Sequence, residues 1–419
     1  MALERGYDVD IVAMRRDPGE PGRAVVDGAQ VYRLPLMHRR GAGPLRVLLE
    51  YLGFTALSGA TCALLSARRR YGAVHVNNPP DFLVVAALPA KLRGAGIILD
   101  VHDLSADMFD MRFGHVRGAR LVERFLDEVQ RFAGRLADVV ITVHEPYRRE
   151  LIARGIAAEK TEVVMNSLDE ALLERARSHG SAAPHCGSAN GRFRVVYHGT
   201  ITPHYGVHVL VEAMPQVLAE LPDVALQVYG EGDSVPAIAE RVRELGLDDH
   251  VHVSARYLPH HEILGVISGA SVGVIPNVAS RLHRFALSSK LFEYVAVGVP
   301  VVASDLPTLR AHFPDGELRF FRSGDPSALA QAILDTARDP EAAAARARAA
   351  RERYEQYRWP VYARRYAQVL DSLAARAEDR CGRRPVSAAR AAGTPGGAAR
   401  PGRPAPPARA VRPSSSTRR

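Results

Sequence analysis

Lys290 and Glu293 place an ammonium and a carboxylate three residues apart in the stretch SSKLFEYVAVGVPVVAS. On a helix, that spacing puts both side chains on one face. Ser288 and Ser289 precede them and are of the residue type that caps helix starts, where backbone amides attract phosphate. Because a carboxylate accepts hydrogen bonds from sugar hydroxyls, this combination predicts a nucleotide-sugar site.

The residues that follow predict a helix leading into a buried strand. Leu291, Phe292 and Val295 would cover the opposite side of the helix and pack on a sheet, leaving the Lys290 face polar. Gly298, with a proline two residues later, indicates the helix end. The short β-branched run over 300–303 is typical of a buried parallel strand.

Strands and helices alternate through the first half of the chain, which predicts a parallel sheet covered on both faces. The expected strands are 9–13, 31–34, 73–76, 97–101, 139–143 and 162–165, with helices near 45–70, 81–93 and 117–136. Ligands gather beyond the carboxyl ends of such strands. His102, just after one strand end, is therefore a candidate functional residue, with an ordinary hydrogen-bonded loop histidine as the alternative.

A second alternation begins near residue 192. The expected strands are 193–197, 224–229, 250–254 and 271–275, with helices at 207–221, 235–245, 260–268, 326–357 and 359–375. Gly199 and Gly230 follow two of these strands, where glycine lets backbone amides approach a phosphate. The small, turn-forming residues of 178–191 predict a linker between two domains.

The net positive charge of the chain comes from its C-terminal segment. The 419 residues carry a formal charge of +9, and the segment 381–419 contains nine arginines and no acid, so the rest is near neutral. This segment is rich in Pro, Gly, Ala and Ser, which predicts a disordered extension or a weak basic tether. We therefore expect no nucleic-acid partner.

Cysteine usage and histidine spacing indicate neither a disulfide framework nor a metal site. The three cysteines, Cys62, Cys186 and Cys381, are widely separated. This favours a reducing cytoplasm. His204 and His208 have helix-like spacing, but Gly206 lies between them and no third ligand converges, so no metal is expected.

Two features near the beginning of the chain carry expectations of their own. The first residues read as the last turn of a helix that ends at Gly6, so we expect a first strand and its glycine-rich loop to be missing. The apolar segment 47–66 contains Glu50 and many small residues, and we interpret it as a core helix, not a membrane span.

Several segments in this order resemble the family 4 glycosyltransferases. The segments are GTITPHYGVHVLVEA (199–213), YGEGD (229–233), 249–257, ASVGVIP (270–276) and 288–304, together with DVHD (100–103) and VVMNSLD (163–169). The resemblance covers roughly residues 3–370. It implies an α/β GT-B fold, in which two Rossmann-like domains face each other across a cleft and the last helix crosses back to the first domain. It also implies retaining sugar transfer from a nucleotide-diphosphate donor, with no cofactor or required metal.

The same resemblance implies roles for individual residues. Glu293 matches the second glutamate of the family's E-x7-E motif, which binds donor ribose hydroxyls, and His102 matches the active-site histidine. With Lys290 these form the expected catalytic set. The residues expected to bind the donor are Gly199, Thr200, Gly230, Glu231, Tyr257, Ser288 and Ser289.

Three positions depart from the family pattern. Phe285 stands where the first glutamate of E-x7-E is expected, and Thr200 and Tyr205 replace two basic residues near the diphosphate. Lys290, with the helix-start amides, is the candidate replacement for the missing charge. Arg281 and Arg284 are weaker candidates for that role.

The expected function is retaining glycosyl transfer to a lipid-linked or glycan acceptor in cell-envelope, exopolysaccharide or glycolipid synthesis. The expected divisions are an N-terminal domain (1–177), a linker (178–191), a C-terminal donor domain (192–357), a crossover helix (358–376) and a basic tail (377–419). The alternatives are a degenerate nucleotide-sugar-binding protein and a GT-B sugar-nucleotide epimerase. A cytoplasmic location is expected.

Arginines near the apolar segment suggest contact with an acidic membrane. Arg39, Arg40 and Arg46 lie beside that segment, and more arginines occur within 112–135. They could rest the first domain on the inner face of the cell membrane. An ordinary arginine-rich surface is the alternative reading.

Overall fold

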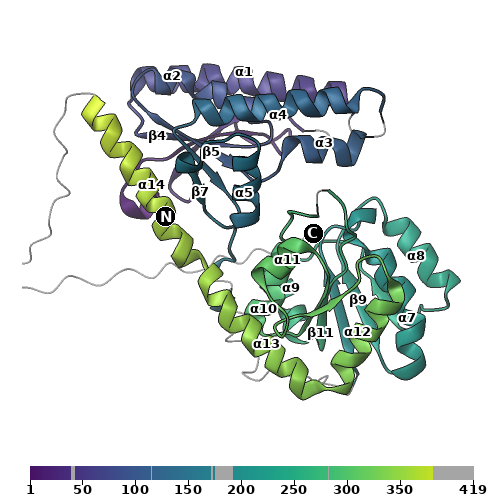
Figure 1. Cartoon of the computed structure of the whole chain (residues 1–419). Helices are drawn as coiled ribbons and strands as arrows, with labels where there is room; N and C mark the ends of the chain where they lie inside the picture. The colour runs from purple at the N-terminus through teal and green to yellow at the C-terminus, as the bar shows by residue number, and fades with distance from the viewer. Residues whose placement is uncertain (39–42, 115, 171–172, 175–191, 282, 381–419) are drawn as a thin grey trace, which may run out of the picture. The chain divides into compact units, whose positions relative to one another are not determined.

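Parallel β-sheets in two domains form the framework of the chain (Figure 1). The computed structural model describes residues 1–380 apart from 39–42, 115, 171–172, 175–191 and 282. The linker predicted over 178–191 and nearly all of the predicted tail lie outside the described residues. The expectation of an α/β fold with two Rossmann-like domains is confirmed.

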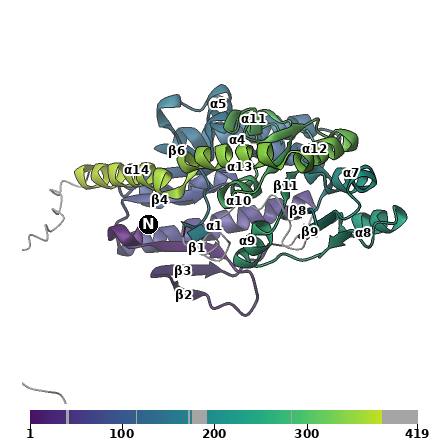
Figure 2. The same ribbon diagram turned by 90° about the horizontal axis from the view of Figure 1, so that it is seen from below.

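The N-terminal domain contains two separate sheets. Four parallel strands run in the order β4 (Ala73–Asn77), β5 (Gly96–Val101), β6 (Val139–Thr142) and β7 (Thr161–Val163). Figure 2 shows the second sheet, in which β1 (Asp10–Met14) pairs in parallel with β3 (Ala29–Leu34), and β3 pairs in antiparallel fashion with β2 (Arg23–Val26). The sequence prediction missed β2, although the Asp27-Gly28 turn, with φ of 48° and 87°, is a strong hairpin signal.

Strand β5 shows why this half of the chain needs cover on both faces. Successive side chains of a strand point to opposite sides. Ile97, Leu99 and Val101 enter one buried cluster, whereas Ile98 packs on the other side with Leu373. Leu373 belongs to α14 (Trp359–Arg380), the last described helix, which therefore covers a face of the N-terminal sheet.

The remaining N-terminal elements are helical. They are η1 (Leu3–Arg5), α1 (Pro44–Arg68), η2 (Asp81–Ala87), α2 (Leu88–Lys91), α3 (Ser105–Phe113), α4 (Ala119–Leu136), α5 (Glu145–Ala153) and η3 (Ala158–Lys160). The single helix predicted over 81–93 is in fact the 3-10 segment η2 followed by the short α2. The interpretation of 47–66 as a core helix was wrong, because much of α1 is exposed, Leu49 by 60%.

The C-terminal domain has one six-stranded sheet, and all of its pairings are parallel. The strand order is β10 (Val251–Val253), β9 (Ala225–Tyr229), β8 (Arg194–His198), β11 (Val272–Ile275), β12 (Val301–Ser304) and β13 (Arg319–Phe321). Val195 and Val196 enter different buried clusters, so helices cover both faces of this sheet as well.

Most helices of this domain follow the predicted alternation. The helices are η4 (Pro203–Tyr205), α7 (Val207–Glu220), α8 (Val235–Glu244), α9 (His260–Ser268), α10 (Ser289–Val297), α11 (Pro307–His312), α12 (Pro326–Arg338), α13 (Pro340–Tyr354) and η5 (Glu355–Tyr357). Helix α11 and the strand β13 that comes after it were not predicted. The helix predicted over 326–357 divides at Asp339, whose carboxylate caps α13 before Pro340. Helix α14 runs to Arg380, four residues beyond the predicted end at 376.

Candidate functional site

Two neighbouring strand ends bring glycine-rich backbone together in the C-terminal domain. Strands β8 and β9 pair in parallel, so Gly199 and Gly230 emerge at the same edge, and Gly199 N–H donates to Tyr229 O over 2.8 Å. A Cβ on Gly230 would overlap the carbonyl oxygen of Gly199. Gly199 itself has φ of 111°, and a Cβ there would overlap Lys290 Cε. Glycine is therefore needed at both positions.

Helix α10 has the predicted boundaries but not the predicted polar face. Gly298 ends it with φ of 88°, as expected, and Ser288 occupies the N-cap position. The Ser288 hydroxyl makes no capping hydrogen bond, so the predicted side-chain cap is wrong. Lys290 and Glu293 are each only 8% exposed, because this face of the helix turns inward against the ends of the strands.

Lys290 is a buried cation held by aromatic rings. Its Nζ lies 4.4 Å from the ring centroid of Tyr205 and 5.4 Å from that of Tyr197. In the described part of the chain, no carboxylate lies within ion-pair distance of this ammonium. Burial lowers the pKa of Lys290 to about 8, and Glu293 opposes the shift only in part. Such a cation is well suited to receive an anionic ligand.

Glu293 lies between His198 and His260, neither of which was predicted as a site residue. His198 Nε2 is 3.5 Å from one carboxylate oxygen, and His260 Nε2 is 3.7 Å from the other. Burial raises the pKa of Glu293 to about 7, with Lys290 opposing, and burial lowers that of His198 to about 3. His198 directly precedes Gly199 at a strand end, and that position is the signal that could have identified it.

The other predicted donor-site residues lie beside this group. The hydroxyls of Thr200 and Tyr257 are 3.0 Å apart, and the carbonyl of Glu231 accepts a hydrogen bond from Ile201 N–H over 2.8 Å. Tyr197 O–H donates to Thr200 O over 2.6 Å. The polar surface at the ends of β8 and β9 is thus continuous with the start of α10.

His102 lies at the end of β5 in the N-terminal domain, within its own hydrogen-bond network. Its Nε2 is 2.9 Å from Asp100 Oδ2, and its Nδ1 is 3.2 Å from Asn166 Nδ2. The backbone amide of His102 donates to Asn78 Oδ1 over 2.8 Å. The Asp100 hydrogen bond raises the pKa of His102 despite partial burial, so the imidazolium form is favoured.

One carboxylate oxygen of Asp100 contacts two histidines. His75 Nε2 lies 3.0 Å from the same Oδ2 that contacts His102, and His75 Nδ1 lies 2.7 Å from the Tyr366 hydroxyl of α14. Burial would raise the pKa of Asp100, but the hydrogen bonds from His102 and His75 outweigh that effect and lower it. The structure thereby links α14 to His102 through two side chains.

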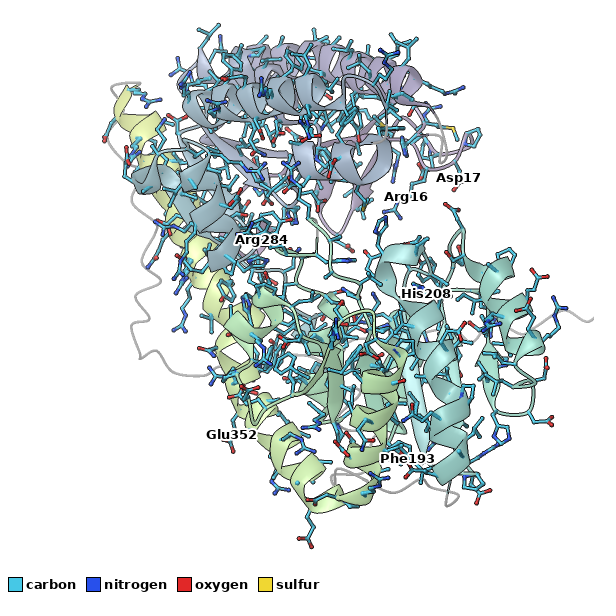
Figure 3. The ribbon with its side chains drawn as sticks, turned by 45° about the vertical axis from the view of Figure 1, so that its right-hand side comes forward. Arg16, Asp17, Phe193, His208, Arg284 and Glu352 are labelled. Atoms are coloured by element: carbon cyan, nitrogen blue, oxygen red, sulfur yellow. The ribbon has the colours of Figure 1, made fainter. Side chains whose placement is uncertain are left out.

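The position of the missing glutamate is filled by a packed aromatic residue. The Phe285 ring lies 6.0 Å from that of Tyr147 and packs with the buried cluster of the N-terminal domain. Of the two weaker phosphate candidates, Arg281 pairs with Asp107 and Glu123 at 2.7 Å and is therefore engaged elsewhere. Arg284, labelled in Figure 3, is exposed and stacks over Phe285.

The histidines weighed as metal ligands do not converge on a common point. His204 contacts the His283 ring, with centroids 6.4 Å apart, and His208 lies on α7 (Figure 3). No three His, Cys, Asp or Glu side chains of the described residues are arranged to hold a metal ion.

Two domain families match the chain. Residues 2–167 match the glycosyl transferase 4-like domain, and residues 192–339 match the glycosyl transferases group 1 domain. Among solved structures, sucrose-phosphate synthase from Thermosynechococcus elongatus aligns with a TM-score of 0.67 and 21% identity, covering 89% of this chain and 90% of that one. Anabaena HepE, solved with UDP and glucose, aligns with a TM-score of 0.61 and 18% identity, covering 86% and 99%.

Relatives matched by sequence come from mycobacteria. Phosphatidyl-myo-inositol mannosyltransferase of Mycobacterium leprae is 30% identical over 179 residues, which cover 41% of this chain and 44% of the relative. Glycogen synthase of Mycobacterium tuberculosis is 29% identical over 275 residues, covering 64% and 61%. The matched region thus spans less than two thirds of either relative.

Proposed function

Because the chain belongs to the glycosyltransferases of the 4-like and group 1 type, we propose that it transfers a sugar from a nucleotide-diphosphate donor to an acceptor hydroxyl, with retained anomeric configuration. The observation that carries the proposal is the buried ammonium of Lys290 against Gly199, in a position to meet a diphosphate. The donor is a substrate, and no cofactor or metal is included in the scheme.

Departure of the diphosphate is the step that needs the most stabilisation. Negative charge grows on the leaving group while the sugar acquires oxocarbenium character. Lys290 and the first amides of α10 are fixed before that charge develops, so little reorganisation is required. The glycines at 199 and 230 let the backbone approach the same phosphates.

Glu293 is proposed to hold the donor ribose. A carboxylate can accept two hydroxyl hydrogen bonds at once, and His198 and His260 lie on either side of Glu293. Thr200, Glu231, Tyr257, Ser288 and Ser289 are proposed to complete the donor site. His102, whose pKa the Asp100 hydrogen bond raises, is proposed to contact the sugar and phosphate from the N-terminal domain.

We propose a lipid-linked or cell-envelope glycan as the acceptor and the inner face of the cell membrane as the location. One supporting observation is the likeness to mannosyltransferases whose names specify phosphatidyl-myo-inositol. A related protein of Mycolicibacterium smegmatis, 29% identical over 180 residues, is named for GDP-mannose. GDP-mannose and UDP-glucose are accordingly the first donors to test.

The test incubates the chain with labelled GDP-mannose and UDP-glucose, with and without extracted membrane lipids, in the presence of EDTA. Transfer to lipid, or slow hydrolysis with a product of retained configuration, supports the proposal, and the Lys290→Met variant should lose this activity. Formation of an epimerised nucleotide sugar would contradict the transferase and indicate an epimerase instead. Activity that vanishes in EDTA and returns with a divalent cation would overturn metal independence.

A second candidate function is nucleotide-sugar binding without transfer. It is favoured by Phe285, which packs with Tyr147 where a donor-sugar contact is expected. Calorimetry with the same two donors separates the candidates. Tight donor binding with no turnover over long incubation would favour the binding protein.

A further inference from the structure

Helix α1 presents an unusually apolar face to solvent. Leu45, Leu49 and Leu64 are 69%, 60% and 64% exposed, and three further leucines of the helix are also exposed, Leu48, Leu52 and Leu57. The sequence over 51–67 contains no charged residue. Isolated exposed leucines are ordinary, but six exposed leucines along one helix of 25 residues, most of it free of charge, are the pattern of a docking surface.

Helix α4 carries a second row of exposed apolar side chains. Leu121, Phe125 and Phe132 are exposed at spacings of four and seven residues, which places them along one side of the helix, with Val122 beside them. Both α1 and α4 pack against η2, and Figure 1 shows them along the same side of the N-terminal domain. We name the ten residues the apolar face: Leu45, Leu48, Leu49, Leu52, Leu57, Leu64, Leu121, Val122, Phe125 and Phe132.

The charges around the apolar face are mainly positive. The exposed arginines on or next to these two helices are Arg46, Arg68, Arg69, Arg70, Arg117, Arg120, Arg124 and Arg135. Glu128 is the exposed acid of α4 and pairs with Arg131 over 2.7 Å, while Glu50 is mostly covered and pairs with Arg46 over 3.0 Å. An apolar surface bordered by arginines complements the acyl boundary and the anionic headgroups of a bilayer.

We propose that the apolar face docks the N-terminal domain onto an acidic phospholipid bilayer, with α1 and α4 lying in the interface. This proposal deepens the proposed function and rests on it, because docking would hold the chain where a lipid-linked acceptor is available. In a pair of chains joined through this face, the surrounding arginines of both copies would approach one another. Charge complementarity therefore favours the bilayer over a second copy.

Helix α1 lies on the membrane and does not cross it in this proposal. Among the described helices it is the one long and apolar enough to span a bilayer by length and composition. Its inner side, however, buries Thr55, Ser58, Leu65 and Ser66 in contact with η2 and α2. A spanning arrangement would strip those contacts from the domain, whereas an interfacial one keeps them.

The test measures sedimentation with vesicles made of equal parts phosphatidylglycerol and phosphatidylcholine, without donor or acceptor. The double variant Leu49→Glu/Leu52→Glu should bind at least about tenfold more weakly. Val25→Glu, at an exposed apolar residue of β2, is the matched control and should bind like the unaltered chain. Arg120→Glu and Arg124→Glu should each weaken binding about fivefold and reduce its salt dependence.

Three outcomes would overturn the proposal. They are unchanged vesicle binding by the Leu49/Leu52 variant with an unaltered melting curve, retention in the membrane after an alkaline carbonate wash, and sedimentation as a dimer that this variant dissociates. Assays of transfer with a soluble acceptor keep the two proposals separate. Loss of vesicle binding by the Leu49/Leu52 variant with transfer to a soluble acceptor intact supports the docking surface and leaves the proposed function unaffected. Vesicle binding by the unaltered chain without any transfer contradicts only the proposed function.

Discussion

Lys290 Nζ lies 4.4 Å from the ring centroid of Tyr205, at the position where the family resemblance leads one to expect a basic residue. The aromatic face attracts the ammonium without neutralising it. A second cation there would repel Lys290 and lower its pKa further, whereas tyrosine keeps the single charge in place. In the proposed donor site, one buried lysine would therefore supply the positive charge for the diphosphate, in place of the two basic residues that the family pattern leads one to expect at positions 200 and 205.

Replacing Lys290 should raise the stability of the protein and abolish nucleotide binding. Burial lowers the pKa of Lys290 to about 8, so holding the charged form in the fold at neutral pH costs on the order of 3 kcal/mol. Lys290→Met removes that cost and should raise the thermal midpoint of the free protein while abolishing detectable binding of UDP or GDP. Differential scanning fluorimetry and calorimetry measure the two effects. A lower midpoint together with intact nucleotide binding would contradict this assignment.

The affinity for a nucleoside diphosphate should peak between about pH 7 and pH 8. The folded pKa of Glu293 is raised to about 7, so below that pH the carboxylate is protonated and loses acceptor capacity for ribose. The folded pKa of Lys290 is lowered to about 8, so above that pH the free protein loses its ammonium. Calorimetric titrations from pH 5.5 to 9.5 should give a bell-shaped curve.

The Glu293→Gln variant tests whether Glu293 causes the acidic limb of that affinity curve. Glu293→Gln should bind nucleotide more weakly near neutral pH and lose the acidic limb, because glutamine does not titrate. For stability, the raised pKa of Glu293 means that the folded state binds the extra proton between its ordinary pKa and about 7. The stability of the unaltered chain relative to Glu293→Gln should therefore fall as pH rises through that window.

Gly199→Ala should impair the donor site through Lys290. A Cβ at this position would overlap Lys290 Cε, and φ of 111° strains any other residue. We expect a loss of about 1–3 kcal/mol in the free energy of unfolding, with a larger relative loss of nucleotide affinity. Gly265→Ala, on α9 with open space around it, is the matched control. Equal effects of the two variants on nucleotide binding would rule out the proposed contact.

Asp100 should control the protonation of His102. Its hydrogen bond raises the pKa of His102, and the resulting stabilisation is full below the ordinary histidine pKa and lost as pH rises through the folded value. Asp100→Asn should lower the His102 midpoint in an NMR titration and move the transfer optimum toward lower pH. Tyr366→Phe, which keeps the ring beside His75, should change that midpoint less. If the His102 midpoint is unchanged in Asp100→Asn, the Asp100 carboxylate is not the cause of the raised pKa of His102.

Local patterns were sufficient to predict most of the elements. The bounds of α9 agree with the prediction, and the end of α10 at Gly298 follows from one residue type. The antiparallel strand β2 was missed because only four residues form it and three of them are exposed. The burial of α1 was misjudged because its apolar residues resemble those of a core helix, and only packing decides which face is covered.

The sequence by itself determined the two-domain α/β alternation and the shared helix face of Lys290 and Glu293, because periodicity, glycine placement and helix spacing are local properties, and the order of its motifs indicated the family. Only the tertiary structure decided that Lys290 and Glu293 are buried, that His198 and His260 flank the carboxylate, and that Asp100 is shared by His75 and His102. Burial and the distances between remote side chains arise from packing, and packing sets the pKa values on which the proposed chemistry depends.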